Sequence, residues 1–96
     1  MGRAKLSEHE VAEGLKKLDG WSIVNGNLHR GFEFKDFGQA FAFMTQVALA
    51  AEKMDHHPDW SNVWNKVTID LNTHSAGGLT KNDFDLAVKI QQIYGR

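Results

Sequence analysis

Apolar and polar residues follow two different periods along the chain, and each period predicts its own kind of element. Apolar residues three and four positions apart indicate three helices, over residues 7–18, 36–54 and 80–94. Alternating or short apolar runs indicate four strands, over residues 21–24, 28–34, 60–64 and 67–72. The predicted order is therefore α-β-β-α-β-β-α.

Residues that cap helices stand at the start of all three helical segments. Ser7 and Glu10 fit a capping box, in which each side chain satisfies a free amide of the first turn. Asp36 is a cap for the long helix, and Thr80 with Asp83 for the last one. For Asp83, capping is the simplest role, although a carboxylate there could also orient a histidine.

Turn residues join the strands in pairs and define the fold class. Asn25-Gly26 is typical of a tight hairpin turn between the first two strands. A turn at Asn65-Lys66 would make Trp64 and Val67 partners in the second hairpin. We expect an α+β fold, with a four-stranded antiparallel sheet and helices packed on one face, in a single domain spanning residues 1–96.

The long helix has apolar residues over half of its circumference. One stripe consists of Phe37, Phe41, Met44, Ala48 and Ala51. A second stripe, about 110° around the helix, consists of Phe43, Val47, Ala50 and Met54. A small sheet can cover the first stripe but hardly both, so we expect the second to contact another subunit in a dimer or tetramer formed through residues 37–54. The alternative is burial of the second stripe under the chain's own helices.

Composition narrows the possible functions. The 96 residues carry a net charge of −1, so electrostatic binding to nucleic acid or anionic lipid has no obvious source. Cysteine is absent, which excludes a thiolate nucleophile and a cysteine-ligated metal. The first ten residues lack the apolar run of a signal peptide, and no segment approaches the roughly 18 apolar residues of a membrane span. We expect a soluble protein of the cytoplasm, with access to the nucleus as well.

Three of the five histidines lie in or beside the second hairpin and are the strongest candidates for chemistry. With the turn at Asn65-Lys66, His57 comes to lie opposite His74, and His56 is next to His57. Glu52, four residues before His56 on the long helix, could approach the same place. The expected site therefore contains His56, His57, His74 and Glu52.

Three hypotheses explain such a cluster. The histidines could be surface residues that happen to be close. They could bind zinc with a water as fourth ligand, although adjacent side chains diverge on an extended backbone. They could also act without a metal, because imidazoles held close together resist full protonation, so that one serves as base and another as acid.

The segment "AEKMDHHPDWSNVWNKVTIDLNTH", followed by "GLTKNDFDLA", resembles the pterin-4a-carbinolamine dehydratases, also known as dimerisation cofactors of a hepatocyte homeodomain transcription factor. The likeness extends over the long helix and covers nearly the whole chain. The positions that match the pattern of this family are Glu52, His56, His57, Pro58, Trp64, His74 and Asp83.

The resemblance implies a function. Members of this family remove water from a 4a-hydroxytetrahydropterin during tetrahydrobiopterin recycling, with no cofactor and no metal. By analogy His56 and His74 would be the acid/base pair, His57 would mainly bind the pterin substrate, and Glu52 and Asp83 would orient them.

The alternative function is a protein-interaction module that stabilises a transcription-factor dimer as a coactivator, in place of the enzyme activity or beside it. It would use the same helix that builds the tetramer of the family, and its partner would be a homeodomain transcription factor. Direct contact with nucleic acid is not expected, nor is contact with a membrane.

Overall fold

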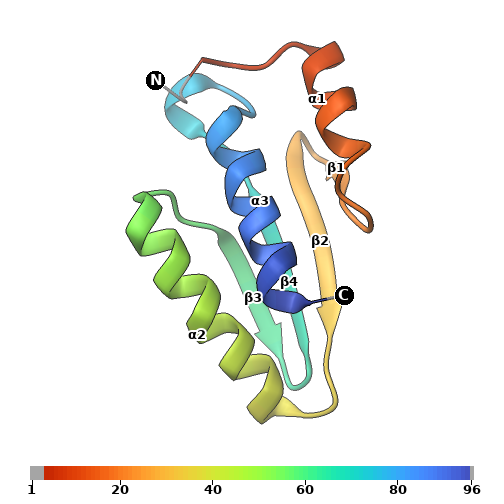
Figure 1. The fold of residues 1–96 in the computed structure, drawn as a ribbon, viewed down its shortest axis with the longest axis vertical. Helices are drawn as coiled ribbons and strands as arrows, with labels where there is room; N and C mark the ends of the chain where they lie inside the picture. The colour runs from red at the N-terminus through yellow and green to blue at the C-terminus, as the bar shows by residue number, and fades with distance from the viewer. Residues whose placement is uncertain (1–3, 96) are drawn as a thin grey trace.

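Four antiparallel strands form one sheet in the order β1-β2-β4-β3, in a computed structural model that describes residues 4–95. Figure 1 shows α2 and α3 lying side by side over one face of this sheet, with α1 near β1. The elements are α1 (Glu8–Leu15), β1 (Ser22–Val24), β2 (Asn27–Glu33), α2 (Phe37–Met54), β3 (Asp59–Val63), β4 (Lys66–Leu71), the short 3-10 helix η1 (His74–Ala76) and α3 (Lys81–Tyr94). The predicted element order and fold class are confirmed.

The three predicted helix caps are present. The Ser7 hydroxyl accepts a hydrogen bond from the Glu10 amide, and the Glu10 carboxylate accepts one from the Ser7 amide. Asp36 accepts from the Gln39 amide at the start of α2. Thr80 and Asp83 form the capping box of α3, so the local sequence alone fixes where each helix begins.

The core lies between the sheet and the pair α2 and α3. Alternation along β4 directs Val67, Ile69 and Leu71 toward the helices, where all three are fully buried. On β2, Leu28 and Phe32 do the same, and Phe32 packs its ring against other aromatic rings of this layer, those of Trp21, Phe43 and Tyr94. The alternate residues, His29 and Gly31 on β2 and Thr68 and Asp70 on β4, therefore lie on the opposite face, which α2 and α3 leave open (Figure 1).

The predicted roles of the two apolar stripes on α2 are wrong. The second stripe faces the core of the same chain: Phe43 and Val47 are buried, whereas Phe37 and Phe41 of the first stripe are 50% and 56% exposed. The reason is that α3 packs beside α2, so the buried face of α2 is the one that meets both the sheet and α3. Leu49 is also 68% exposed.

The turn of the second hairpin is one residue earlier than predicted. Val63 pairs with Lys66, so the two turn residues are Trp64 and Asn65. Trp64 takes a left-handed conformation with φ 52°, which is uncommon for a bulky residue. Asn65 stabilises this geometry, because its amide side chain donates to the Phe34 carbonyl and its own carbonyl accepts from the Phe34 amide. The turn is thereby joined to the end of β2.

Within residues 4–95, no helix has both the length and the apolar character needed to cross a membrane.

The burial pattern of α2 gives the first testable prediction. Val47→Glu places an unpaired charge in the core and should lower the free energy of unfolding by roughly 3 kcal/mol or more, as measured by urea denaturation followed by circular dichroism. Gln46→Glu, at an exposed position of the same helix, is the matched control and should change stability by less than about 0.5 kcal/mol. Equal effects of the two substitutions would contradict this placement of α2.

Candidate active site

The open face of the sheet carries rows of polar side chains contributed by three strands. His29 of β2 and Asp59 of β3 both lie opposite Asp70 of β4. His29 Nδ1 and Asp70 Oδ1 are 2.9 Å apart, within hydrogen-bond distance. In the next row, at the open end of the second hairpin, Asn72 Nδ2 donates to Asn27 Oδ1 over 3.0 Å. The antiparallel register thus gathers polar groups that are far apart in sequence.

A pocket of about 70 Å³ opens at this end of the sheet. Every residue that lines it is polar: Asn27, His57, Asp59, Asp70, Asn72 and His74. The two histidines come from the segment just before β3 and the segment just after β4, so they approach the pocket from two different chain segments. Such a pocket combines groups that can transfer protons with carboxylates and amides that can bind a polar ligand.

His57 is accessible and only loosely held. Its Nε2 atom lies 3.0 Å from Glu52 Oε1, and the two side chains are 57% and 81% exposed. Ion pairs at such exposure contribute little to stability, because water competes for both groups. The imidazole of His57 can therefore reorient toward a ligand at small cost.

His74 lies where the hairpin ends. Thr73 and Gly78 form an isolated bridge, and His74 begins η1 directly after Thr73. Within the described residues, the His74 ring has no hydrogen-bond partner. This ring is consequently available to a ligand on both of its nitrogens.

His56 belongs to a buried polar network behind this pocket. It is only 8% exposed, and its Nε2 atom lies 2.6 Å from Asp83 Oδ1. The other oxygen of Asp83 accepts from the Thr73 hydroxyl over 2.8 Å and from the Thr80 amide over 2.9 Å. Asp83 itself has no exposed surface. A carboxylate that accepts several hydrogen bonds in this way holds its partners in fixed positions.

The two adjacent histidines face different surroundings because of the backbone before them. Asp55 ends α2 in the left-handed conformation, with φ 54° and ψ 42°, and the His56 amide donates to the Ala51 carbonyl. After this reversal, His56 contacts Asp83 on α3, whereas His57 contacts Glu52 on α2.

The structure divides the three imidazoles that the sequence led us to expect together. His57 and His74 line one pocket, and His56 is not among the residues that line it. The expected pairing of His57 with His74 is wrong, because it requires Trp64 opposite Val67, whereas the observed register pairs Val63 with Lys66. The expected supporting residues each accompany one imidazole, Glu52 with His57 and Asp83 with His56.

The donor groups in residues 4–95 do not form a ligand set for a metal. No three side chains of histidine, aspartate or glutamate in that range are arranged so that they could hold one ion. The three-histidine zinc arrangement considered from the sequence is accordingly not formed by His56, His57 and His74.

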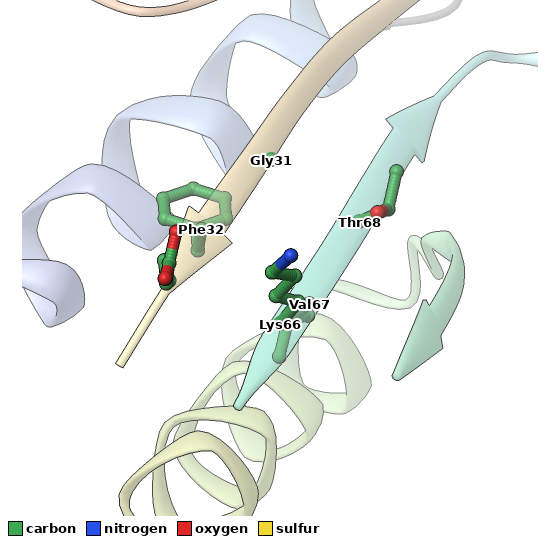
Figure 2. A pocket seen from close by; sticks show the side chains of 6 residues that line it. Gly31, Phe32, Lys66, Val67 and Thr68 are labelled. Atoms are coloured by element: carbon green, nitrogen blue, oxygen red, sulfur yellow. The ribbon is translucent and has the colours of Figure 1, made fainter. Parts of the chain in front are cut away.

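A second and shallower hollow lies further along the same face. Figure 2 shows it between β2 and β4. Gly31 has no side chain and Thr68 has a short one, and the Lys66 side chain lies at one end of the hollow. Its volume is about 340 Å³. A side chain at position 31 would meet only open space, since no atom lies within 4 Å of the place its Cβ would take. This hollow carries no imidazole.

Sequence reasoning missed most of the polar wall of the pocket. Asn27, Asp59, Asp70 and Asn72 line the pocket, and none of them was among the predicted site residues. The signal that could have found them is the register, because with Val63 opposite Lys66 two aspartates face each other across the hairpin.

Comparison with known proteins gives consistent matches over nearly the whole chain. The family model described as pterin 4 alpha carbinolamine dehydratase matches residues 4–93. A relative from Solibacter usitatus is 54% identical over 89 residues, covering 93% of this chain and 94% of its own length. A relative from Mesorhizobium japonicum is 52% identical over 97 residues, covering 99% of each. Both are provisionally named pterin-4-alpha-carbinolamine dehydratases.

Two solved structures share the fold. The crystal structure of a transcriptional coactivator/pterin dehydratase from Brucella melitensis matches with a TM-score of 0.92 and 48% identity, covering 95% of this chain and 99% of the other. A pterin dehydratase-like protein identified as a RuBisCO assembly factor of the alpha-carboxysome matches with a TM-score of 0.65 and 21% identity, covering 78% and 87%. At that identity the second match shows a common fold only.

The buried network gives the second prediction. Asp83→Ala removes the acceptor of three hydrogen bonds and should lower the free energy of unfolding by about 2–4 kcal/mol. Asp85→Ala, on the same helix, loses only an exposed pair with Lys81 and should cost less than about 0.5 kcal/mol. Urea denaturation of both variants measures the difference, and a loss at position 83 no larger than at position 85 would refute the role of the network.

Proposed function

Because the chain belongs to the pterin-4a-carbinolamine dehydratase family, we propose that it catalyses the dehydration of a 4a-hydroxytetrahydropterin to the quinonoid dihydropterin, by acid/base chemistry of its histidines without a metal. The observation that carries this proposal is that His57 and His74 line one polar pocket. A cytoplasmic location and a role in tetrahydrobiopterin recycling are part of the same proposal.

The reaction needs one acid and one base on the same substrate. The acid protonates the 4a-hydroxyl as the C4a–O bond breaks and water leaves. The base takes the proton from N5, and the electron pair of the broken N5–H bond forms the N5–C4a double bond. Imidazole suits both tasks, because its ordinary pKa is close to neutral pH.

His57 and His74 are the groups that we propose to touch the substrate. They reach the pocket from two chain segments, so a flat ring bound between them could meet an acid and a base at once. Glu52 lies at hydrogen-bond distance from His57, where it can orient the ring. His74 is free to give or take a proton.

In this proposal His56 is a positioning residue that does not touch the substrate. Asp83 joins His56 to Thr73, the residue before His74, so the network fixes the backbone on both sides of the pocket. This division of roles differs from the one implied by the family resemblance, in which His56 and His74 form the acid/base pair. The geometry favours His57 because His57, unlike His56, lines the pocket.

Alanine variants of the three histidines give the third prediction. His57→Ala and His74→Ala should each lower kcat by roughly 10²-fold or more, the usual contribution of one acid/base group. His56→Ala should lower kcat less and lower the thermal midpoint more, since it removes a buried partner of Asp83. The measurement is carbinolamine decay by stopped-flow absorbance, with and without a chelator, beside thermal denaturation of each variant.

His9→Ala, in the exposed first turn of α1, is the control and should leave both readouts unchanged. Wild-type rates in the His56→Ala, His57→Ala and His74→Ala variants would refute catalysis by histidine. Loss of activity on chelation would refute a mechanism without a metal. A His56→Ala variant that is stable but inactive, with His57→Ala affecting only KM, would restore the roles that the resemblance implies.

We propose further that the chain forms a homo-oligomer through the exposed side of α2. The ring centroids of Phe37 and Phe41 lie 5.8 Å apart and both side chains are half exposed, and Leu49 is exposed on the same helix. Val63 and Trp64, at the β3–β4 turn, are exposed at the same end of the molecule as the start of α2 (Figure 1). So many large apolar groups on a small domain indicate a contact surface.

A protein-interaction function, as in a transcriptional coactivator, would use this same surface. The Brucella melitensis structure is described as such a coactivator as well as a dehydratase. A homeodomain transcription factor would then compete with self-association for Phe37 and Phe41, so the two functions need not exclude each other.

The fourth prediction tests the surface on α2. Phe41→Glu should shift the protein to a smaller species in light scattering at micromolar concentration, because the new charge would be desolvated in the contact. Its circular dichroism should remain helical, since Phe41 is outside the core. Gln46→Glu, on the polar side of the same helix, is the control and should leave the assembly intact. A wild-type protein that is already monomeric would refute the oligomer.

A further inference from the structure

Two carboxylates face each other across the β3–β4 ladder at the wall of the pocket. Asp59 and Asp70 are directly paired in the register and both line the pocket. Like charges in this position destabilise a sheet. Asp70 has a partner on its other side, since His29 Nδ1 lies 2.9 Å from Asp70 Oδ1. The side chain of Asp59 has no hydrogen-bond partner within the described residues, so its carboxylate is unpaired at the pocket wall.

The two carboxylates share the pocket with the proposed acid/base groups, since Asp59, Asp70, His57 and His74 all line it. Asp59 is two residues after His57 in the chain, and Asp70 is four residues before His74. A ring that meets the histidines with its reacting C4a–N5 bond can therefore direct its other edge toward the carboxylates.

The far edge of a 2-amino-4-oxo pyrimidine ring carries two adjacent donors, the N3–H group and the 2-amino group. A carboxylate accepts two parallel hydrogen bonds of this kind, and hydrogen bonds to an ionised acceptor are stronger than neutral ones. Both oxygens of Asp59 are open to such donors, as is Oδ2 of Asp70, because only Oδ1 contacts His29. A ring with oxygen in place of the 2-amino group would instead direct lone pairs at the same carboxylates.

We propose that Asp59 and Asp70 bind the N3–H and 2-amino edge of the substrate and make the site selective for 2-amino-4-oxo pterins over 2,4-dioxo rings. The inference rests on the proposed dehydratase function and adds the residues that determine its specificity. His29 acts here as a positioning residue that holds Asp70. The like-charge pair is then explained, because the substrate supplies the donors that the sheet lacks.

The test measures binding and selectivity separately from catalysis. The ligands are 6-methyl-7,8-dihydropterin, which cannot undergo the dehydration, and the matching 7,8-dihydrolumazine with oxygen at position 2. Asp59→Asn and Asp70→Asn should each raise the Kd for the dihydropterin by roughly 10- to 100-fold, as measured by isothermal titration calorimetry. The Kd for the dihydrolumazine should stay unchanged or fall, so selectivity should collapse in both variants.

Glu33→Gln is the matched control. Glu33 is also a carboxylate on the open face of the sheet, but it lies opposite Lys66 and outside the pocket. This variant should keep the wild-type Kd for both ligands. Asp59→Asn removes a like-charge pair, so its thermal midpoint should equal or exceed that of the wild type, which separates weakened binding from loss of the fold.

The outcomes separate this inference from the proposed function. Unchanged dihydropterin binding in both aspartate variants would overturn the inference even if the wild type is an active dehydratase. Failure of the wild type to bind the dihydropterin at millimolar concentration would overturn it as well. A wild type that binds the dihydropterin through these aspartates but does not accelerate carbinolamine decay would sustain the inference and refute the proposed reaction.

Discussion

The hydrogen bonds of Asp83 connect the three chain segments from which the candidate site is built. This buried carboxylate belongs to the first turn of α3, and it accepts hydrogen bonds from His56 after α2 and from Thr73 after β4. Burial of a charge is unfavourable unless every lone pair is used, and here both oxygens are engaged. The helix cap and the site are therefore one network, and neither can move without the other.

The other half of the site depends on the open face of the sheet. Because α2 and α3 cover only one face, the alternate residues of β2, β3 and β4 remain free to be polar. His29, Asp70 and Asp59 occupy one such row, and the pocket lies beside it. The hydrogen-bonded ladder of the sheet holds these groups in fixed positions. The short segments at the end of the sheet supply the histidines.

The sequence predicted those features that local chemistry determines. Caps at Ser7, Asp36 and Thr80 are local hydrogen bonds, and the alternation in β4 is a local period, so all of them could be derived without the fold. The spacing of the histidines along the chain also indicated a site. The predictions that failed depended on contacts with a second helix or strand.

Each failure has a physical cause outside the local sequence. Both stripes of α2 are apolar, and only the position of α3 decides that Val47 is buried and Phe41 exposed. The turn at Trp64 and Asn65 depends on hydrogen bonds between Asn65 and Phe34, which is distant in sequence. Because the register was shifted, the pairing of Asp59 with Asp70 could not be seen, and the pocket wall was missed with it.

The reversal at Asp55 has a consequence for the length of the chain. His56 and His57 are consecutive, yet one enters the interior and the other the pocket, and this separation depends on where α2 ends. Inserting or deleting one residue between Met54 and Pro58 would move both imidazoles relative to the end of α2, so that Asp83 or the pocket would lose its histidine. The site therefore fixes the length of the link between α2 and β3, whereas an ordinary exposed loop can vary in length.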